Sequence, residues 1–406
     1  NTRKFLALAS ANLFNNPSKK LFTVAITGTK GKTSTSFMLK NILEQTSKKV
    51  GIIGTTGIIF NDTHIESDNS TPESYLLHKY MRDMLDSGID TLVMEASSQG
   101  FKMDRTYGIN FDIGIFTNLS PDHIGESEHK DFDEYLNCKK MLFSQCITGF
   151  FNCDDENFIN ISSNCTCKMI TFGKNKNANV KYSNDAYFSE NGKLFSSFDI
   201  SFQAETYHFK IPLLGEISVY NSACAAAAAC YLGISFKDIE RGLCKTRIIG
   251  RNEIVPIPLD FTVIIDYAHN EVSTESVFKT ISHYNNGRII SVFGCGGNRS
   301  RLRRYAMGDI ISKNSDITIV TSDNSRFEKL DDIISDIYVG IKSPKGEVIT
   351  IKDRKSAINY ALSAAKSNDI VLLLGKGNQD YEEINGVKYP FDERLVVADY
   401  FKKASK

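Results

Sequence analysis

The chain has 406 residues, 41% of them hydrophobic, a length that favours two or three domains with sizeable cores. Lysine plus arginine and aspartate plus glutamate both number 48, so no global basic charge indicates a nucleic-acid or membrane-surface partner. No stretch approaches the ~20 apolar residues of a membrane helix and no signal peptide opens the chain, so we expect no membrane association.

The first part of the chain alternates short apolar runs with helical patterns. Residues 21–26 predict a strand, a glycine loop follows, and residues 34–45 have helical periodicity. Further buried strands are expected at residues 50–53, 91–94 and 113–116, with helices at 72–87 and 132–143. This alternation predicts a largely parallel sheet covered by helices.

The middle of the chain has a different pattern. Residues 180–211 read as alternating strands interrupted by Asn191-Gly192, which predicts an antiparallel hairpin region, and residues 223–232 predict an alanine-rich core helix. A second α/β rhythm follows, with strands expected at 262–265, 288–293, 317–321 and 370–374. We predict an α/β protein with a P-loop ATP-binding domain at residues 1–248 and a Rossmann-like domain at residues 249–406.

The nine cysteines stand at scattered positions without a paired framework. Their odd number is typical of a reducing compartment, so we expect a cytoplasmic protein. Cys165 and Cys167 form a close pair, but no second pair stands at zinc-ligand spacing. We therefore predict no zinc site.

The segment Gly28-Thr29-Lys30-Gly31-Lys32-Thr33 lies between a predicted strand and a predicted helix. Its backbone N–H groups and the helix N-terminus, which begins near Ser34, can bind phosphate oxygens, while Lys32 adds charge and Thr33 can reach Mg²⁺. Ile26 stands where the strict P-loop pattern has glycine, so the motif is a partial match that its context supports. We predict ATP or GTP binding.

Polar residues also follow other predicted strands of the first half, at the sheet edge where ligands bind. Glu95 is a candidate Mg²⁺ ligand, although a lone glutamate there is more often a cap or ion-pair partner. Asp122 and His123 follow the strand at 113–116, and a lone histidine is more often structural. Lys139, taken alone, looks like a solvated surface lysine.

Four strands of the second half also end in polar or glycine-rich segments. Because the carboxyl ends of parallel strands share one edge, they predict a ligand cleft facing the first domain. The segments are Asp266–Asn270, Gly294–Arg299, Asp323–Arg326 and Gly375–Gly377.

Taken together and in order, these motifs resemble those of the Mur ligase family, and within it the MurE-type enzymes that add the third residue of the peptidoglycan precursor peptide. The resemblance runs from about Thr2 to the C-terminus. Seven segments carry it: Thr27–Thr33, Met94–Ser98, Phe116–His123, Tyr135–Phe143, Asp266–His269, Phe293–Gly297 and Asp323–Arg326.

The resemblance implies ATP-dependent ligation through an acyl-phosphate. Lys32, Glu95, His123 and a carbamylated Lys139 would be catalytic, with Thr33, Glu95, His123 and Lys139 arranging two Mg²⁺ ions around the ATP phosphates. By the same similarity, further residues lie around the nucleotide: Asn118, Asn221, Arg251, Asp266 and His269.

The resemblance also implies an amino-acid site in the second domain. Arg326 matches an arginine that binds the distal carboxylate of meso-diaminopimelate, and Arg299 matches a second one. A dicarboxylic amino acid is therefore favoured over lysine, although Gln379 replaces the family's usual glutamate. The full set of expected substrate residues is Ser70, Thr71, Ser97, Arg299, Asp323, Asn324, Arg326, Gly375 and Gln379.

The leading hypothesis is a monomeric ligase that extends UDP-MurNAc-L-Ala-D-Glu, although the sequence lacks the family's uridine-binding N-terminal domain. One alternative is a MurE-like ligase retasked to another carboxylate, in specialised metabolism or polyamino-acid synthesis. Another is a non-catalytic nucleotide-binding protein, against which the retention of Lys32, Glu95, His123 and Lys139 argues.

Overall fold

The computed structural model describes residues 1–406 except 123, 126–127, 191–192, 285–286 and 405–406. It contains two compact units. One consists of residues 1–185, 197–211 and 217–246, and the other of residues 186–196, 212–216 and 247–406. The domain boundary expected after residue 248 remains a prediction. Within the described ranges, no helix is long and apolar enough to cross a membrane.

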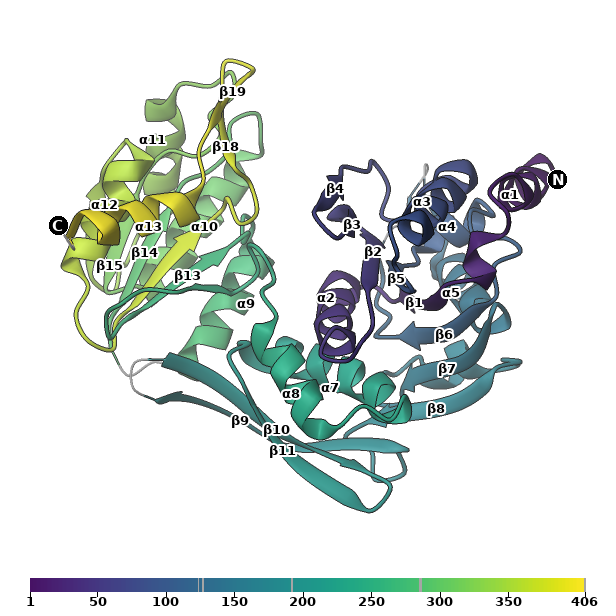
Figure 1. The fold of residues 1–406 in the computed structure, drawn as a ribbon. Helices are drawn as coiled ribbons and strands as arrows, with labels where there is room; N and C mark the ends of the chain where they lie inside the picture. The colour runs from purple at the N-terminus through teal and green to yellow at the C-terminus, as the bar shows by residue number, and fades with distance from the viewer. Residues whose placement is uncertain (123, 126–127, 191–192, 285–286, 405–406) are drawn as a thin grey trace. The chain divides into compact units, whose positions relative to one another are not determined.

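An eleven-stranded sheet, in the order β11-β10-β9-β8-β7-β6-β1-β5-β2-β3-β4, belongs mainly to unit 1, and only residues 186–196 of β9 and β10 are assigned to unit 2 (Figure 1). Strands β7, β6, β1, β5 and β2 are parallel, and β2, β3 and β4 are antiparallel. The strands are β1 (Phe22–Thr27), β2 (Val50–Gly54), β3 (Gly57–Phe60), β4 (Thr63–Ile65), β5 (Thr91–Glu95), β6 (Phe111–Phe116), β7 (Cys146–Asn152), β8 (Lys168–Gly173), β9 (Val180–Glu190), β10 (Lys193–Phe202) and β11 (Glu205–Ile211).

The four strands expected in the first part of the chain are confirmed as β1, β2, β5 and β6. Strands β2 and β5 are buried along their whole length, because their apolar residues face helices on both sides of the sheet. The hairpin region is confirmed as the consecutive neighbours β9, β10 and β11, with Asn191-Gly192 outside the described residues. The sequence did not predict β7 and β8.

The helices of unit 1 are α1 (Thr2–Leu13), η1 (Pro17–Lys19), α2 (Lys32–Leu43), α3 (Ser74–Asp86), α4 (Ser98–Lys102), α5 (Phe132–Lys140), η2 (Met141–Ser144), α6 (Phe158–Ser162), α7 (Gly215–Tyr231) and α8 (Phe236–Lys245). The helices expected at 72–87 and 132–143 are confirmed as α3 and α5, the latter tightening into η2. The alanine-rich helix is longer than expected, since α7 begins at Gly215.

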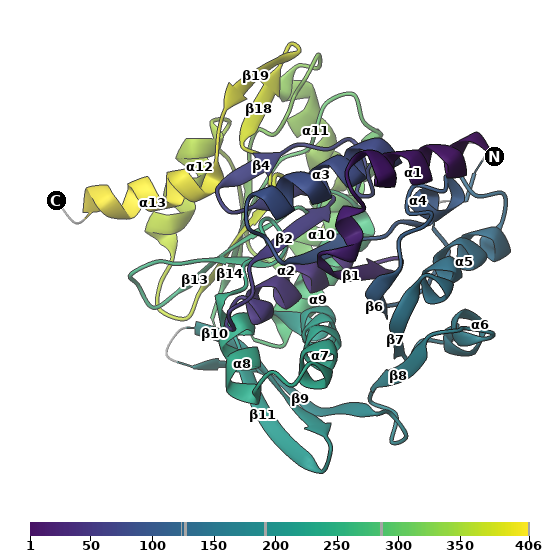
Figure 2. The same ribbon diagram turned by 45° about the vertical axis from the view of Figure 1, so that its right-hand side comes forward.

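Close packing holds α2, the helix that follows the phosphate loop. Helix α8 lies between α2 and β11 in both views (Figures 1 and 2). A β-carbon built on Gly242 of α8 would lie 2.5 Å from the Cα atom of Ile42 in α2. The absence of a side chain at Gly242 therefore permits this close approach.

Unit 2 contains a six-stranded sheet in the order β12-β13-β17-β14-β15-β16, parallel from β13 to β16. Its strands are β12 (Glu253–Val255), β13 (Thr262–Asp266), β14 (Ile289–Phe293), β15 (Ile317–Val320), β16 (Glu347–Thr350) and β17 (Ile370–Leu374), and a separate hairpin contains β18 (Tyr381–Ile384) and β19 (Val387–Pro390). The four strands expected in this half are confirmed as β13, β14, β15 and β17.

Helices cover both faces of this sheet, and each face has its own apolar core. Helices α9, α10 and α11 contribute to one core, whereas α12 and α13 contribute to the other. Their bounds are α9 (Glu271–Ser282), α10 (Arg301–Asn314), α11 (Leu330–Gly340), α12 (Arg354–Ala364) and α13 (Glu393–Ala404). This doubly wound arrangement places ligand-binding loops at the carboxyl ends of the strands.

His78 in α3 predicts a pH dependence of stability. The side chain is buried, both ring nitrogens lack a hydrogen-bond partner among the described residues, and burial lowers its pKa from 6.5 to about 4. Below pH 6.5 the unfolded chain binds a proton that the native protein excludes, so the free energy of unfolding falls until about pH 4. At 1.36 kcal/mol per pKa unit this loss approaches ~3 kcal/mol.

We expect His78→Leu to remove this contribution, measured as urea unfolding midpoints between pH 4 and 7.5. The exposed His283 offers a control, because it forms no ion pair with the described residues, and His283→Leu should leave the slope intact. An unchanged slope in His78→Leu would contradict the assignment.

Candidate active site

The phosphate loop joins β1 to α2, as the sequence predicted. Gly31 caps α2 with a φ of 84°, and a β-carbon there would lie 2.4 Å from Oδ1 of Asn221. A β-carbon on Gly28 would lie 1.9 Å from Oγ1 of Thr117. Both glycines are therefore needed for the loop to pack against these side chains, and the helix N-terminus after them suits phosphate.

A second segment, after β6, holds the loop in place. The Asn118 side chain accepts from the Lys30 amide at 2.9 Å and donates to its carbonyl at 3.0 Å, and the Thr29 amide donates to the Asn118 carbonyl at 2.9 Å. The hydroxyls of Thr29 and Tyr135 are 3.0 Å apart. Asn118 thus braces the phosphate loop through its side-chain amide.

The chain after β7 supports this segment in turn, which sequence reasoning missed. Asn152 donates to the Thr117 carbonyl at 2.7 Å, and the Asp155 carboxylate accepts from the Leu119 amide at 2.8 Å. Polar residues at the end of a strand identified Glu95, and the same signal could have identified Asn152 and Asp155. It was missed because β7 itself was not predicted.

Glu95 ends β5 as a buried carboxylate facing the start of α2. It accepts from the Thr33 hydroxyl at 2.8 Å and from the Thr55 amide and hydroxyl at 2.9 and 3.1 Å. Within the described part of the chain, no lysine or arginine forms an ion pair with it. A buried carboxylate beside a hydroxyl, without a cation partner, is a fitting place for a hard divalent cation.

Other side chains must complete such a cation site. The described residues contain no cluster of three or more His, Cys, Asp and Glu groups that could hold a metal. His123, the remaining expected ligand, lies outside the described residues.

Two lysines converge on the phosphate loop. Lys32 Nζ donates to the carbonyls of Gly28 and Thr29 at 2.8 and 3.0 Å, and Lys139 Nζ donates to the Gly28 carbonyl at 2.8 Å. Lys139 is only 2% exposed, and its Nζ lies 4.5 Å from the ring centroid of Tyr135. The lysine that, taken alone, looked like a surface group is therefore buried beside the phosphate loop.

Burial perturbs both amines. Desolvation lowers the pKa of Lys32, partly opposed by the charges of Glu95 and Asp122. Desolvation and then the Lys32 charge hold the pKa of Lys139 well below its ordinary value. This environment favours an uncharged, nucleophilic amine at Lys139.

The expected substrate residues of unit 1 lie behind Glu95. The Thr71 hydroxyl donates to the Glu95 carbonyl and accepts from the Ser97 amide, both at 2.9 Å. Ser97 caps α4 by accepting from the Gly100 amide at 3.0 Å, and Ser70 directly precedes Thr71. These hydroxyls order the segment, and substrate contact remains a prediction.

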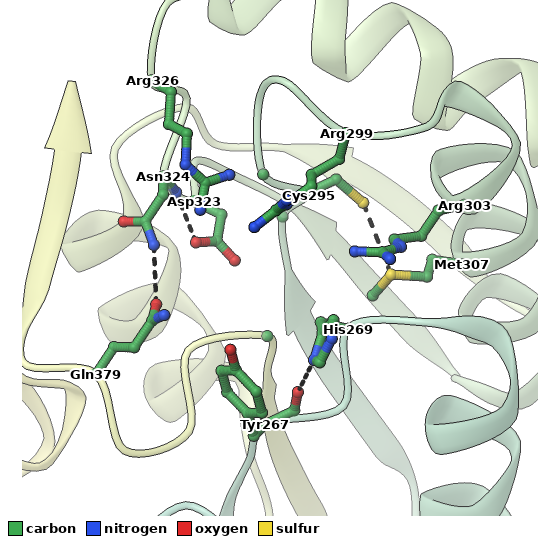
Figure 3. Close-up of a pocket in the computed structure, with 13 residues that line it drawn as sticks. Tyr267, His269, Cys295, Arg299, Arg303, Met307, Asp323, Asn324, Arg326 and Gln379 are labelled. Carbon is green, nitrogen blue, oxygen red and sulfur yellow. Dashed lines mark hydrogen bonds between the residues drawn. The ribbon is translucent and has the colours of Figure 1, made fainter. Parts of the chain in front are cut away.

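In unit 2, the loops after β13, β14, β15 and β17 meet in one pocket (Figure 3). The convergence of these four strand ends is therefore confirmed within this unit. The lining residues are Tyr267, His269, Gly294, Cys295, Gly296, Arg299, Arg303, Met307, Asp323, Asn324, Arg326, Gly375 and Gln379.

Three guanidinium groups and one carboxylate dominate the pocket. Arg326 donates to the Gly297 carbonyl at 2.7 Å and pairs with Glu383 at 3.3 Å. Asp323 lies 3.6 Å from the buried Lys376 ammonium, and Arg299 points toward the same space (Figure 3). The pocket suits a ligand with more than one carboxylate.

Arg303 and Met307 were missed by sequence reasoning. They are four residues apart on α10, a spacing that places side chains on one helix face and could have identified them together, and Arg299 lies just before that helix. Arg303 thus adds a third guanidinium to the pocket.

The side-chain amides of Asn324 and Gln379 form another wall of the pocket. Asn324 Nδ2 donates to Gln379 Oε1 at 2.8 Å, and Asn324 Oδ1 accepts from Lys376 and from the Glu383 amide at 3.1 and 2.9 Å. Gln379 is therefore held in the pocket as a neutral group.

The expected nucleotide residues of unit 2 follow β13. Asp266 accepts from the Asn252 and Ala268 amides, both at 2.7 Å, and burial raises its pKa. His269 lines the same pocket, with Nδ1 2.8 Å from the Tyr267 carbonyl, while Arg251 lies 5.3 Å from the Tyr267 ring centroid. The structure brings His269 together with Arg326, and Asp266 mainly orders the backbone.

Arg354 holds two pocket loops from beneath. This buried side chain donates to the carbonyls of Ser322 and Leu374 at 2.9 Å each, and to Glu393 at 2.9 Å. It thereby fixes the loops after β15 and β17 relative to each other, across the end of β14.

We expect the double variant Arg354→Met/Glu393→Leu, which leaves no lone buried charge, to weaken ligand binding in the pocket about tenfold or more, because small misplacements are costly. Ligand binding at the phosphate loop should stay within about twofold, since unit 1 is untouched, and titration of each site measures the change. Arg288→Met/Asp369→Leu is the control at the amino ends of β14 and β17, where the pair lies 2.7 Å apart. Equal changes at both sites would contradict a positioning role.

Known proteins support the same assignment of the two halves. The Mur ligase middle domain matches residues 26–229, and the Mur ligase, glutamate ligase domain matches residues 250–377. The chain is 40% identical to UDP-N-acetylmuramoyl-L-alanyl-D-glutamate–2,6-diaminopimelate ligase 1 of Clostridium acetobutylicum, covering 99% of this chain and 82% of that protein. It is 37% identical to the corresponding ligase of Aquifex aeolicus, covering 98% and 81%.

Solved structures agree. A UDP-N-acetylmuramoyl-L-alanyl-D-glutamate–2,6-diaminopimelate ligase aligns with a TM-score of 0.77 at 27% identity, covering 95% of this chain and 79% of that one. Folylpolyglutamate synthase of Mycobacterium tuberculosis shares the fold, with a TM-score of 0.66 at 17% identity and 92% of both chains covered.

Proposed function

We propose that this chain joins meso-diaminopimelate to UDP-N-acetylmuramoyl-L-alanyl-D-glutamate, on the premise of its family. The chain belongs to the Mur ligase family of ATP-dependent, amide-forming ligases. The observation that carries the proposal is the pocket with Arg299, Arg303, Arg326 and Asp323 at the carboxyl edge of the second sheet. Carboxylates of the amino acid would bind the guanidinium groups, and an ammonium would bind Asp323.

Unit 1 would carry out phosphoryl transfer. A carboxylate oxygen of the acceptor attacks the γ-phosphorus of ATP, and ADP leaves. The loop amides and Lys32 would bind the phosphate oxygens, and Lys32 would offset the charge that builds on the transferred group. Thr33 and Glu95 would hold Mg²⁺, which supplies further charge neutralisation when bound.

Unit 2 would supply the nucleophile. The amine of the amino acid attacks the acyl carbon, and the tetrahedral adduct collapses to the amide as phosphate leaves. The pocket residues would orient the amine by binding the rest of the amino acid. Translational and rotational entropy is then lost on binding and not in the reaction.

We propose in addition that Lys139 is carbamylated and, with Glu95 and His123, arranges two Mg²⁺ ions. The uncharged amine would attack CO₂, forming an N–C bond and releasing a proton, and the product is a carboxylate in the buried site. The support is the burial of Lys139 and its lowered pKa, beside the phosphate loop.

The carbamate is testable with ¹³C-bicarbonate. We expect a carbamate signal in the protein that Lys139→Met lacks, and activity that falls in CO₂-depleted buffer and returns with bicarbonate. Lys140→Met alters the neighbouring helix position, which is partly exposed, and should retain the signal. A signal that persists in Lys139→Met would overturn the carbamate proposal.

A retasked ligase is favoured by one observation, the neutral Gln379–Asn324 pair in a pocket with three arginines. A phosphate-release screen that crosses acceptors with amino acids distinguishes the two. Turnover requiring both the uridine-linked dipeptide and meso-diaminopimelate supports the first proposal. Turnover with another carboxylate, and none with the uridine-linked acceptor, refutes it.

A further inference from the structure

Three cysteines gather at one corner of unit 1, at the opposite end of β7 from the phosphate loop. Cys146 begins β7, while Cys165 and Cys167 lie in the link between α6 and β8. All three pack against one hydrophobic cluster and all are free thiols. They take no part in the ligase site described above.

Two glycines place two of these sulfurs side by side. Gly114 of β6 and Gly149 of β7 are paired across the sheet. A β-carbon on Gly114 would lie 2.8 Å from Cys146 Sγ, and one on Gly149 would lie 2.7 Å from Cys167 Sγ. The sulfurs thus occupy the space above two glycines that are neighbours across the sheet.

The environments of the two sulfurs differ. Hydrogen bonds from the thiols of Cys146 and Cys165 and from the Gly149 amide lower the pKa of Cys167 to about 7. Hydrogen bonding to Cys167 and burial raise the pKa of Cys146. Of the two thiols, Cys167 therefore ionises more readily than Cys146.

Access differs in the same sense. Cys167 is partly exposed in a segment whose neighbours Thr166, Lys168 and Met169 are exposed. Cys146 is 6% exposed. A small oxidant in solution therefore reacts with Cys167 first. Cys146 is accessible to the adjacent Cys167 within the same chain.

We propose that Cys167 is a peroxide-reactive thiol whose oxidised form is converted by Cys146 into a reversible disulfide. The Cys167 thiolate attacks a peroxide oxygen, the O–O bond breaks, and a sulfenic acid and hydroxide (or alkoxide) form. The Cys146 sulfur then attacks the Cys167 sulfur, the S–O bond breaks, and water leaves. The cysteine pair loses two electrons, and the hydroperoxide gains them.

Cys146 is the favoured partner of Cys167. A bridge between Cys165 and Cys167 would close a small ring across a single intervening residue, which strains the disulfide torsion. The Cys146 sulfur is a hydrogen-bonding neighbour of Cys167, and the two sulfurs lie over the paired glycines Gly114 and Gly149.

The first test needs no variant. The full chain is alkylated with iodoacetamide between pH 5 and 9, and each cysteine is followed by mass spectrometry. At pH 7 we expect Cys167 to react about tenfold or more faster than Cys153, with a midpoint near pH 7. Cys153 is the matched control, because it is also partly exposed but has its pKa raised by burial.

The second test maps the oxidation product. Residues 141–168 contain no lysine or arginine before Lys168, so trypsin leaves these cysteines in one peptide, and cleavage after Glu156 separates Cys146 from Cys165 and Cys167. In a Cys153→Ser background, stoichiometric hydrogen peroxide should produce a Cys146–Cys167 link that dithiothreitol reverses. In Cys146→Ser, Cys167 should instead accumulate as a sulfenic acid that dimedone traps.

Three results would overturn the proposal: alkylation of Cys167 no faster than Cys153, a Cys165–Cys167 link as the main product, or no dimedone adduct in Cys146→Ser. Thermal unfolding of each variant checks that the fold is retained, and the wild-type alkylation rates decide the first point if a variant fails to fold.

Discussion

Replacing Lys32 by methionine is expected to lower kcat by about 10²- to 10³-fold, because in the proposed mechanism this ammonium offsets the charge on the transferred phosphoryl group. The Lys32 ammonium lies inside the phosphate loop, 2.8 Å from the Gly28 carbonyl. Methionine keeps the length of the side chain but cannot offset the charge that develops during transfer. Phosphate release at saturating substrates measures the change.

Lys40→Met is the matched control for this variant. Lys40 lies on the same helix and pairs with Glu44 at 2.7 Å, away from the loop. Its kcat should match that of the parent protein. Retention of more than a tenth of the parent kcat in Lys32→Met would refute the assigned role of Lys32.

The second large effect concerns Arg326. We expect Arg326→Met to raise the KM for the amino acid by about 30- to 10³-fold, equivalent to roughly 2–4 kcal/mol, because a carboxylate would lose its charged partner in a partly buried pocket. The KM for ATP should change little, since Arg326 belongs to unit 2. The measurement is initial rate against amino-acid concentration at saturating ATP.

Arg301→Met is the control for Arg326. Arg301 lies at the start of α10, is exposed, and approaches Asp336 at 3.5 Å without lining the pocket. Arg326 also bonds to Gly297 and Glu383, so thermal unfolding must show that the variant is folded. A folded Arg326→Met protein with an unchanged amino-acid KM would place the carboxylate elsewhere in the pocket.

Local patterns predicted much of the fold. The strands β1, β2, β5 and β6 are apolar runs next to glycine or polar residues. The apolar run and its flanking residues therefore predict the same strand bounds. The phosphate loop was predicted from its strand-loop-helix context, and the position of Glu95 from the end of a buried strand. In each case a short segment contains the whole signal.

Other features depend on distant parts of the chain. The contact between Lys139 and the Gly28 carbonyl spans 111 positions, and nothing in the local pattern of α5 distinguishes this lysine from a solvated one. The resemblance to a family identified it instead. Likewise α7 begins at Gly215, eight residues before the alanine-rich run, since packing overrides the weaker helix propensity of that first part.

The brace formed by Arg354 has a consequence for how this pocket can change. The guanidinium binds main-chain carbonyls of the loops after β15 and β17, so these two backbone segments are held by a residue that does not line the cavity. Lining positions such as Gln379 and Arg303 can therefore be exchanged while these carbonyls stay in place. Single substitutions can alter which amino acid is accepted on an unchanged backbone, and a designer could use the same positions first.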